Sequence, residues 1–275
     1  MNFLHNISDK ELLEIGRSKH ESYISADPFP SGYYDNLFNP QLLDEILEEL
    51  PDMQRNPENV YNDQNQIKLA ANDEYKFGPK TKAFLHYLNS GPFLNFLSAL
   101  TGIENLIPDP HFLGGGYHQI LRDGFLKVHA DFNKHRTNGL DRRINALVYL
   151  NKDWKEEYGG HFQLWDREMK DCKAKILPVF NRLAIFSTSD FSFHGHPDPL
   201  TCPPDRSRKS IAVYYYSNGR PDSDKNPNAE ANDTLFKYRP AGDEDAKTKT
   251  RLSNFVQLVT PPVLYFGVKK LLNRK

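Results

Sequence analysis

Apolar residues in the first hundred or so positions recur at the three- and four-residue spacing of amphipathic helices. The clearest case is the segment 39–51, in which Asn39 can cap the first turn. Its apolar face consists of Leu43, Ile46, Leu47 and Leu50. The segments 79–91 and 92–103 predict two further amphipathic helices, and Gly102 ends the second. We therefore expect the N-terminal part of the chain to be mostly helical.

The pattern changes to short alternating runs between Gly114 and Ser217. About eight runs are rich in β-branched or aromatic residues, and they are GYHQILR, FLKVHADF, RINALVYLN, GHFQLW, AKILPVF, RLAIFST, FSFHGHP and KSIAVYYYS. Because there is little room for crossover helices between them, we expect antiparallel sheets. The sequence thus predicts a mainly β fold with flanking helices (α+β). Its core would be a double-stranded β-helix, the jelly-roll or cupin-like architecture.

The remaining C-terminal part is polar and then amphipathic. The stretch 218–249 is rich in Asp, Asn, Lys and Pro, which favours a loop or a flap. The segment 253–275 predicts a basic helix with a break at Pro261-Pro262, which either packs on the N-terminal helices or lies on a membrane surface. We expect one domain over 1–275, with helical support (1–110), a jelly-roll core (111–220), and a polar loop with the C-terminal helix (221–275).

Composition and charge argue against several classes of protein. The 275 residues include 35 Lys+Arg against 36 Asp+Glu, a balance that does not suggest nucleic acid as a partner. The two cysteines lie far apart, which argues against a disulfide framework or a zinc cluster and favours a reducing compartment. The N-terminus has no apolar stretch of the secretory type, and the apolar run 263–268 is too short to span a bilayer. We expect a cytoplasmic protein without a transmembrane segment.

The candidate chemistry centres on His129-Ala130-Asp131 in the run FLKVHADF. Residues i and i+2 of a strand point to the same face, so this spacing places an imidazole beside a carboxylate. One more histidine would complete a 2-His-1-carboxylate triad, which leaves positions on iron open for a chelating cosubstrate and O2. HxD alone is weak evidence in a chain with 10 His, and a second one occurs at His196-Pro197-Asp198. The later FSFHGHP and RKSIAVYYYS runs strengthen the first.

The run that begins at Arg208 has two different faces. One face carries Arg208, Ser210, Ala212 and Tyr214, and the other carries Ile211, Val213 and Tyr215. A buried arginine without a partner is costly, so Arg208 needs an anion if its face lines the barrel. The distal carboxylate of 2-oxoglutarate would serve, because a guanidinium matches a carboxylate in geometry and charge. The alternative is an arginine that faces solvent at the start of a strand.

The segment from about Gly114 to Pro221 resembles the Fe(II)- and 2-oxoglutarate-dependent dioxygenases of the prolyl 4-hydroxylase-like superfamily, in a bacterial or phage-type branch. HADFN is similar to the metal-binding strand of that family, and RRINALVYLNKDW followed by EEYGGHFQLW is similar to its YLN-x-x-W…GG stretch. SFHGHPDPL and RSRKSIAVYYY are similar to the strands that carry the distal histidine and the arginine. The resemblance implies Fe(II) as the metal, 2-oxoglutarate and O2 as cosubstrates, and ascorbate as a reductant.

Carried over by position, the resemblance implies three iron ligands. His129 and Asp131 match the HxD pair, and His194 matches the distal histidine because it is the first histidine of HGHP. His196 is the competing candidate for that third position.

The resemblance also implies a cosubstrate site. Arg208 matches the residue that binds the distal carboxylate of 2-oxoglutarate, with Ser210 as a helper, and Tyr214 on the same face is expected to shape the pocket. Members of the family usually place a tyrosine several residues before HxD, and ILRDGFLKVHAD has none. Tyr117 and Gln119, on the preceding strand-like run, are the candidates to replace it.

The implied reaction is hydroxylation of an unactivated C–H bond, with 2-oxoglutarate converted into succinate and CO2. Asp131 favours hydroxylation, because halogenases of this class replace the carboxylate by a small residue. The resemblance suggests a prolyl residue of a protein or peptide as the substrate, with a small molecule as the alternative. Two other classes of function compete: a non-catalytic cupin-like module that binds a metal or ligand, and a cupin-type metal-dependent isomerase. The triad together with Arg208 argues against the former, and the lack of a further histidine on the HxD strand argues against the latter.

Overall fold

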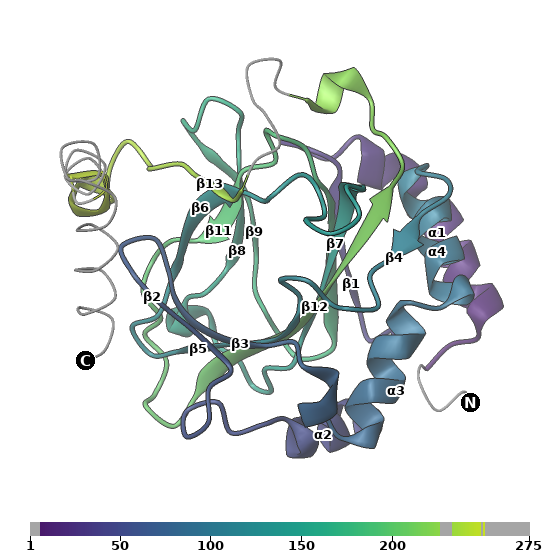
Figure 1. Cartoon of the computed structure of the whole chain (residues 1–275), viewed down its shortest axis with the longest axis horizontal. Helices are drawn as coiled ribbons and strands as arrows, with labels where there is room; N and C mark the ends of the chain where they lie inside the picture. Colours follow the sequence, from purple (N-terminus) through teal and green to yellow (C-terminus); the bar gives the residue numbers. More distant parts are fainter. Residues whose placement is uncertain (1–5, 226–232, 249, 251–275) are drawn as a thin grey trace.

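The computed structural model describes residues 6–225, 233–248 and 250 (Figure 1). The helices are α1 (Asp9–Ile24), α2 (Pro40–Glu49), α3 (Pro79–Leu88) and α4 (Gly91–Thr101), with the 3-10 turns η1 (Glu74–Lys76), η2 (Glu156–Tyr158) and η3 (Asp222–Asp224). The first strands are β1 (Ser31–Asp35), β2 (Asn59–Asn62), β3 (Ile67–Ala71) and β4 (Ile107–Pro108). The later strands are β5 (Gly116–Leu121), β6 (Leu126–Ala130), β7 (Asp141–Tyr149), β8 (Phe162–Trp165), β9 (Cys172–Ile176), β10 (Arg182–Ser187), β11 (His194–His196), β12 (Ser207–Ser217) and β13 (Leu235–Phe236).

The three helices expected from apolar spacing are confirmed as α2, α3 and α4. The side-chain oxygen of Asn39 accepts hydrogen bonds from the backbone N–H groups of Gln41 and Leu42, which caps α2. Helix α4 ends at Gly102, whose φ of 71° lies in the left-handed region that glycine tolerates best. Local sequence therefore determines where both helices begin or end.

Each of the eight strand-like runs overlaps one strand, β5 to β12, so that prediction is confirmed. Every pairing between described strands is antiparallel, as expected. The larger sheet has the order β1-β10-β7-β12-β5-β3-β2, with β4 beside β12, and the smaller has the order β13-β6-β11-β8-β9. This is the expected mainly β fold with flanking helices.

The expectation that residues 1–110 are mostly helical is wrong in part, because this region also supplies β1 to β4 to the larger sheet. β1 pairs with β10, and β3 pairs with β5 and with β2. These strands are short, and β1, β3 and β4 lie beside strands from the distant central part of the chain. Their stability comes from that pairing rather than from a strong local pattern.

The main core lies between the helices and the outer face of the larger sheet. Figure 1 shows α1, α3 and α4 gathered on the side of this sheet that faces away from β6, β8 and β11. Helix residues such as Phe84 and Phe96 join the sheet residues Ile211, Val213 and Tyr215 in one buried apolar cluster. The outer face of β12 is thereby fixed against the helices, and its inner face points toward the smaller sheet.

The polar region after β12 is only partly irregular. Strand β13 within it pairs with β6, the strand that carries His129. The helix expected over 253–275, together with its membrane-surface alternative, lies outside the described residues. Among the helices that the structure describes, none is both long and apolar enough to cross a membrane.

Phe93 connects α4 to the larger sheet, since its ring lies 5.5 Å from Phe96 and 6.2 Å from Tyr215. We expect Phe93→Ala to lower the free energy of unfolding by about 3–5 kcal/mol, because it leaves a cavity among buried rings. Urea unfolding followed by circular dichroism measures this change. The control Tyr75→Ala, at a side chain that is 94% exposed, should change the free energy by less than about 0.5 kcal/mol. Equal effects of the two substitutions would contradict the assigned packing.

Candidate metal centre and cosubstrate cavity

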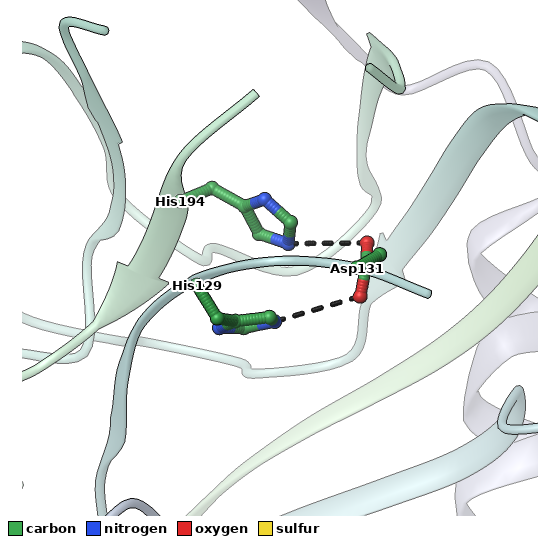
Figure 2. A group of neighbouring side chains, drawn as sticks. All are labelled: His129, Asp131 and His194. Atoms are coloured by element: carbon green, nitrogen blue, oxygen red, sulfur yellow. Dashed lines mark ion pairs between the residues drawn. The ribbon is translucent and has the colours of Figure 1, made fainter. Parts of the chain in front are cut away.

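His129, Asp131 and His194 converge at one point between the two sheets (Figure 2). His129 and His194 are direct partners in the pairing of β6 with β11, and Asp131 directly follows β6. One potential ligand atom of each residue lies within 4.8 Å of the other two. The structure thus brings together the three residues that the sequence predicted as ligands.

Hydrogen bonds orient both imidazole rings. The Nδ1 atom of His129 lies 2.8 Å from the carbonyl oxygen of Lys127, and Nδ1 of His194 lies 2.8 Å from that of Ser192. A carbonyl oxygen can only accept, so Nδ1 carries the proton and Nε2 presents a lone pair. The Nε2 atoms lie 3.5 Å (His129) and 3.4 Å (His194) from the Asp131 carboxylate oxygens. All three donors therefore face one small volume.

Two residues of β7 hold the Asp131 carboxylate. Asn145 donates its amide N–H to Oδ2 at 2.7 Å, and the Arg142 guanidinium lies 3.2 Å from the same oxygen. Arg142 also donates to the side-chain oxygen of Asn145 at 2.8 Å. Its guanidinium carbon lies 4.4 Å and 3.5 Å from the ring centroids of Phe132 and Tyr214. These contacts fix the carboxylate in one orientation.

Electrostatics favour the metal-binding form of these groups. Burial acts to raise the pKa of Asp131, but the Arg142 guanidinium and the neighbouring imidazoles hold it well below its usual range. Burial lowers the pKa of His194 to about 3. An ionised carboxylate and two imidazoles that offer lone pairs form a 2-His-1-carboxylate set, which suits Fe(II).

A cavity of about 70 Å³ extends from this group into the barrel. It is lined by Lys68, His118, Ile120, Leu126, His129, Asp131, Asn145, Leu147, Phe162, Phe186, His194, Gly195, His196, Arg208, Ser210 and Tyr214. The predicted inner face of β12 is therefore the face that lines the cavity. Ser210 and Tyr214 lie on it as expected, and the Tyr214 hydroxyl donates to the Gly114 carbonyl at 2.9 Å.

Arg208 is buried in this cavity, with 4% of its surface exposed. Its guanidinium donates to the Gly160 carbonyl at 2.8 Å and to the Tyr149 hydroxyl at 3.1 Å. A Cβ on Gly160 would lie 3.0 Å from the Arg208 side chain, so glycine permits this close approach. Among the described residues, no carboxylate lies within ion-pair distance of Arg208. The solvent-facing alternative is therefore wrong, and the arginine lacks an anionic partner.

Tyr117 and Gln119 do not line the cavity, so the structure contradicts their expected contact with the cosubstrate. Tyr117 belongs to the apolar core on the opposite face of the sheet, and Gln119 donates to the Ser207 hydroxyl. The reason is register. Ile120 lies opposite Arg208 and His118 lies opposite Ser210, and directly opposed residues share a face.

Sequence reasoning missed several residues of the site. Asn145 and Tyr149 lie on one face of β7. The other face carries Ile144 and Val148, which join the main core. The alternation of residues along RRINALVYL could have distinguished these two faces. Lys68 was missed because β3 itself was missed. No local signal marks that residue.

A wider pocket of about 260 Å³, the outer pocket, opens onto the metal-binding group. Its aromatic walls are Tyr61, Phe132, Tyr214 and Phe236. Lys68 lines both this pocket and the inner cavity, and Arg136 lies at the rim. Burial lowers the pKa of Lys68 to about 8, against the opposing effect of Asp131. The pocket is thus aromatic and partly cationic.

Comparison with protein families matches residues 115–216 to the 2OG-Fe(II) oxygenase superfamily. A stretch of 79 residues is 32% identical to mouse prolyl 3-hydroxylase OGFOD1 and covers 27% of this chain. The match spans only 14% of the length of that relative.

Solved structures share the fold at low sequence identity. A Trichoplax adhaerens prolyl hydroxylase, in complex with a hypoxia-inducible factor peptide, is 16% identical with a TM-score of 0.55, over 75% of this chain and 91% of that one. HygX from Streptomyces hygroscopicus, with nickel, 2-oxoglutarate and hygromycin B bound, is 12% identical with a TM-score of 0.52, over 83% of this chain and 98% of that one. The segment matched by the family is the one that supplies β5 to β12 and the three converging side chains. Residues 115–216 of the chain are therefore similar to the 2OG-Fe(II) oxygenase superfamily, and the chain shares its fold with a prolyl hydroxylase.

Proposed function

We propose that the protein is an Fe(II)- and 2-oxoglutarate-dependent dioxygenase that hydroxylates an unactivated C–H bond. One oxygen atom of O2 enters the product as hydroxyl, and the other enters succinate as 2-oxoglutarate loses CO2. The observation that carries the proposal is the pairing of two features in one small cavity. The His129–Asp131–His194 group lines this cavity together with the buried Arg208, which has no carboxylate partner among the described residues.

Each residue has a definite task in this proposal. His129, Asp131 and His194 hold the metal, while Asn145 and Arg142 keep the carboxylate oriented. The bound metal and 2-oxoglutarate together supply the oxidising chemistry.

A second set of residues holds the cosubstrate. Arg208 binds its distal carboxylate, with Ser210 and the Tyr149 hydroxyl beside it. Because these groups are fixed by backbone and side-chain contacts, the cosubstrate meets a prearranged site.

Hydroxylation is favoured over halogenation because Asp131 is present and is held by Asn145 and Arg142. A halide would need the position that this carboxylate takes. A non-catalytic binding module would not need both a three-residue metal site and Arg208 as a separate binding group for a carboxylate.

We propose a prolyl residue of a protein or peptide as the substrate. Two similar proteins, a prolyl 3-hydroxylase and a prolyl hydroxylase with a bound peptide, support this choice. The aromatic walls of the outer pocket also suit a pyrrolidine ring. Ascorbate would serve as the reductant that restores Fe(II). Two free thiols, Cys172 and Cys202, fit a reducing compartment such as the cytoplasm.

The first experiment needs no substrate. Metal-free protein is mixed anaerobically with Fe(II) and then with 2-oxoglutarate, and the visible charge-transfer band of the chelate is recorded. We expect the band in the wild type and its loss in His129→Ala and His194→Ala. No band at saturating Fe(II) and 2-oxoglutarate would overturn the proposal and favour a binding module.

The same titration tests Arg208. We expect Arg208→Ala to weaken 2-oxoglutarate binding at least about 30-fold, because losing one partner of a buried charge pair costs about 2 kcal/mol or more. Arg122→Ala is the control, since this side chain is 46% exposed and lies outside the cavity. Equal affinities in the wild type and Arg208→Ala would assign the carboxylate to another residue.

Asn145 provides a test of the carboxylate support. We expect Asn145→Ala to weaken Fe(II) binding about 10- to 100-fold, the usual effect of removing a group that orients a metal ligand. Anaerobic metal titration measures the affinity, and Asn218→Ala, at an exposed residue just after β12, is the control. Unchanged affinity in Asn145→Ala would mean that Arg142 alone orients Asp131.

A further inference from the structure

His196 lies two residues beyond His194 on β11 and lines the same inner cavity. Only 3% of its surface is exposed. The pairing of β11 with β6 shifts register between the two histidines, so that His194 lies opposite His129 and His196 lies opposite Leu126. His196 is thus placed one step deeper into the barrel than the metal-binding group.

Neither ring nitrogen of His196 has a hydrogen-bond partner among the described residues. The rings of His129 and His194 are different, because each has its Nδ1 beside a backbone carbonyl. Buried polar atoms are nearly always paired, and leaving one unpaired is costly. The ring of His196 therefore lacks the hydrogen bond to a backbone carbonyl that orients the other two rings. Both of its nitrogens are available for a hydrogen bond inside the cavity.

Two other polar groups near the cavity are already engaged. His118 has its Nε2 3.2 Å from the Gly114 carbonyl, and the Tyr149 hydroxyl accepts from Arg208. Arg208 has five N–H donors, of which these contacts and the one to Gly160 use a part. The unsatisfied donors of this cavity thus include Arg208 and His196, which calls for an acceptor that both can reach.

We propose that His196 is a further cosubstrate-binding residue, which donates a ring N–H to the distal carboxylate of 2-oxoglutarate beside the Arg208 guanidinium. A histidine ring has at least one N–H donor in either protonation state, so the contact does not depend on its charge. This inference rests on the proposed function, and it assigns His196 a role other than that of competing iron ligand.

The spacing along β11 agrees with this role. Two residues of a strand advance about 6–7 Å. A five-carbon dicarboxylate that is bound through its keto-acid end beside His194 must reach a comparable distance into the barrel. Its far end then arrives where His196 and Arg208 line the cavity.

The test measures how tightly Fe(II)-loaded protein binds two chelating keto acids in the absence of oxygen. One is 2-oxoglutarate, and the other is 2-oxopentanoate, which has the same chain length but no distal carboxylate. His196→Leu removes the donor, and His196→Asn restores an amide N–H. We expect His196→Leu to weaken 2-oxoglutarate binding about tenfold or more, with less than a twofold change for 2-oxopentanoate. We expect His196→Asn to recover part of the loss.

His135→Leu is the matched control, because His135 is also buried, with 4% exposed, but packs against Tyr216 outside the cavity. It should leave both affinities unchanged. Unchanged 2-oxoglutarate binding in His196→Leu would overturn the inference. So would an equal loss for both keto acids, or a loss of Fe(II) binding, since either places His196 at the metal or in the fold. Absence of the band in the wild type is a separate result that overturns the proposed function itself.

Discussion

Strand β12 is hydrogen-bonded along both edges, to β7 on one side and to β5 on the other, and the site depends on this double pairing. Its outer residues are locked by the helices that pack on the larger sheet. A shift of the pairing register by one residue would turn Arg208 and Ser210 into the apolar core and expose Ile211 to the cavity. Such a shift is unfavourable because polar and apolar residues alternate along this part of the strand. The packing of the outer face thus determines the chemistry of the inner face.

The inner cavity contains buried polar groups that lower the stability of the fold. Arg208 is desolvated without a carboxylate, and His196 has two unpaired ring nitrogens. Such costs are tolerated where a ligand removes them on binding. An anion that satisfied both residues would stabilise the folded chain by mass action.

Sequence reasoning succeeded where the determining interactions are local or repeat along one strand. The cap at Asn39, the end of α4 at Gly102 and the two faces of β12 are of this kind. It failed for Tyr117 and Gln119, because which face of β5 lines the cavity depends on how β5 is aligned with β12, almost a hundred positions later. It also missed Lys68, since β3 is held by β2 and β5 rather than by its own pattern.

The segment that matches the superfamily and the rest of the chain contribute different parts of the site. His129, Asp131, His194 and Arg208 all lie within residues 115–216, the part that matches the superfamily. The outer pocket takes Tyr61 and Lys68 from β2 and β3, and Phe236 from β13, all outside the matched segment. The ring of Phe236 lies 5.5 Å from the ring of His129, its partner in the pairing of β13 with β6, so a segment far along the chain contacts the metal-binding group. Phe132 and Tyr214 of the same pocket lie inside the matched segment, so its walls combine residues that are similar to the superfamily with residues from other parts of this chain.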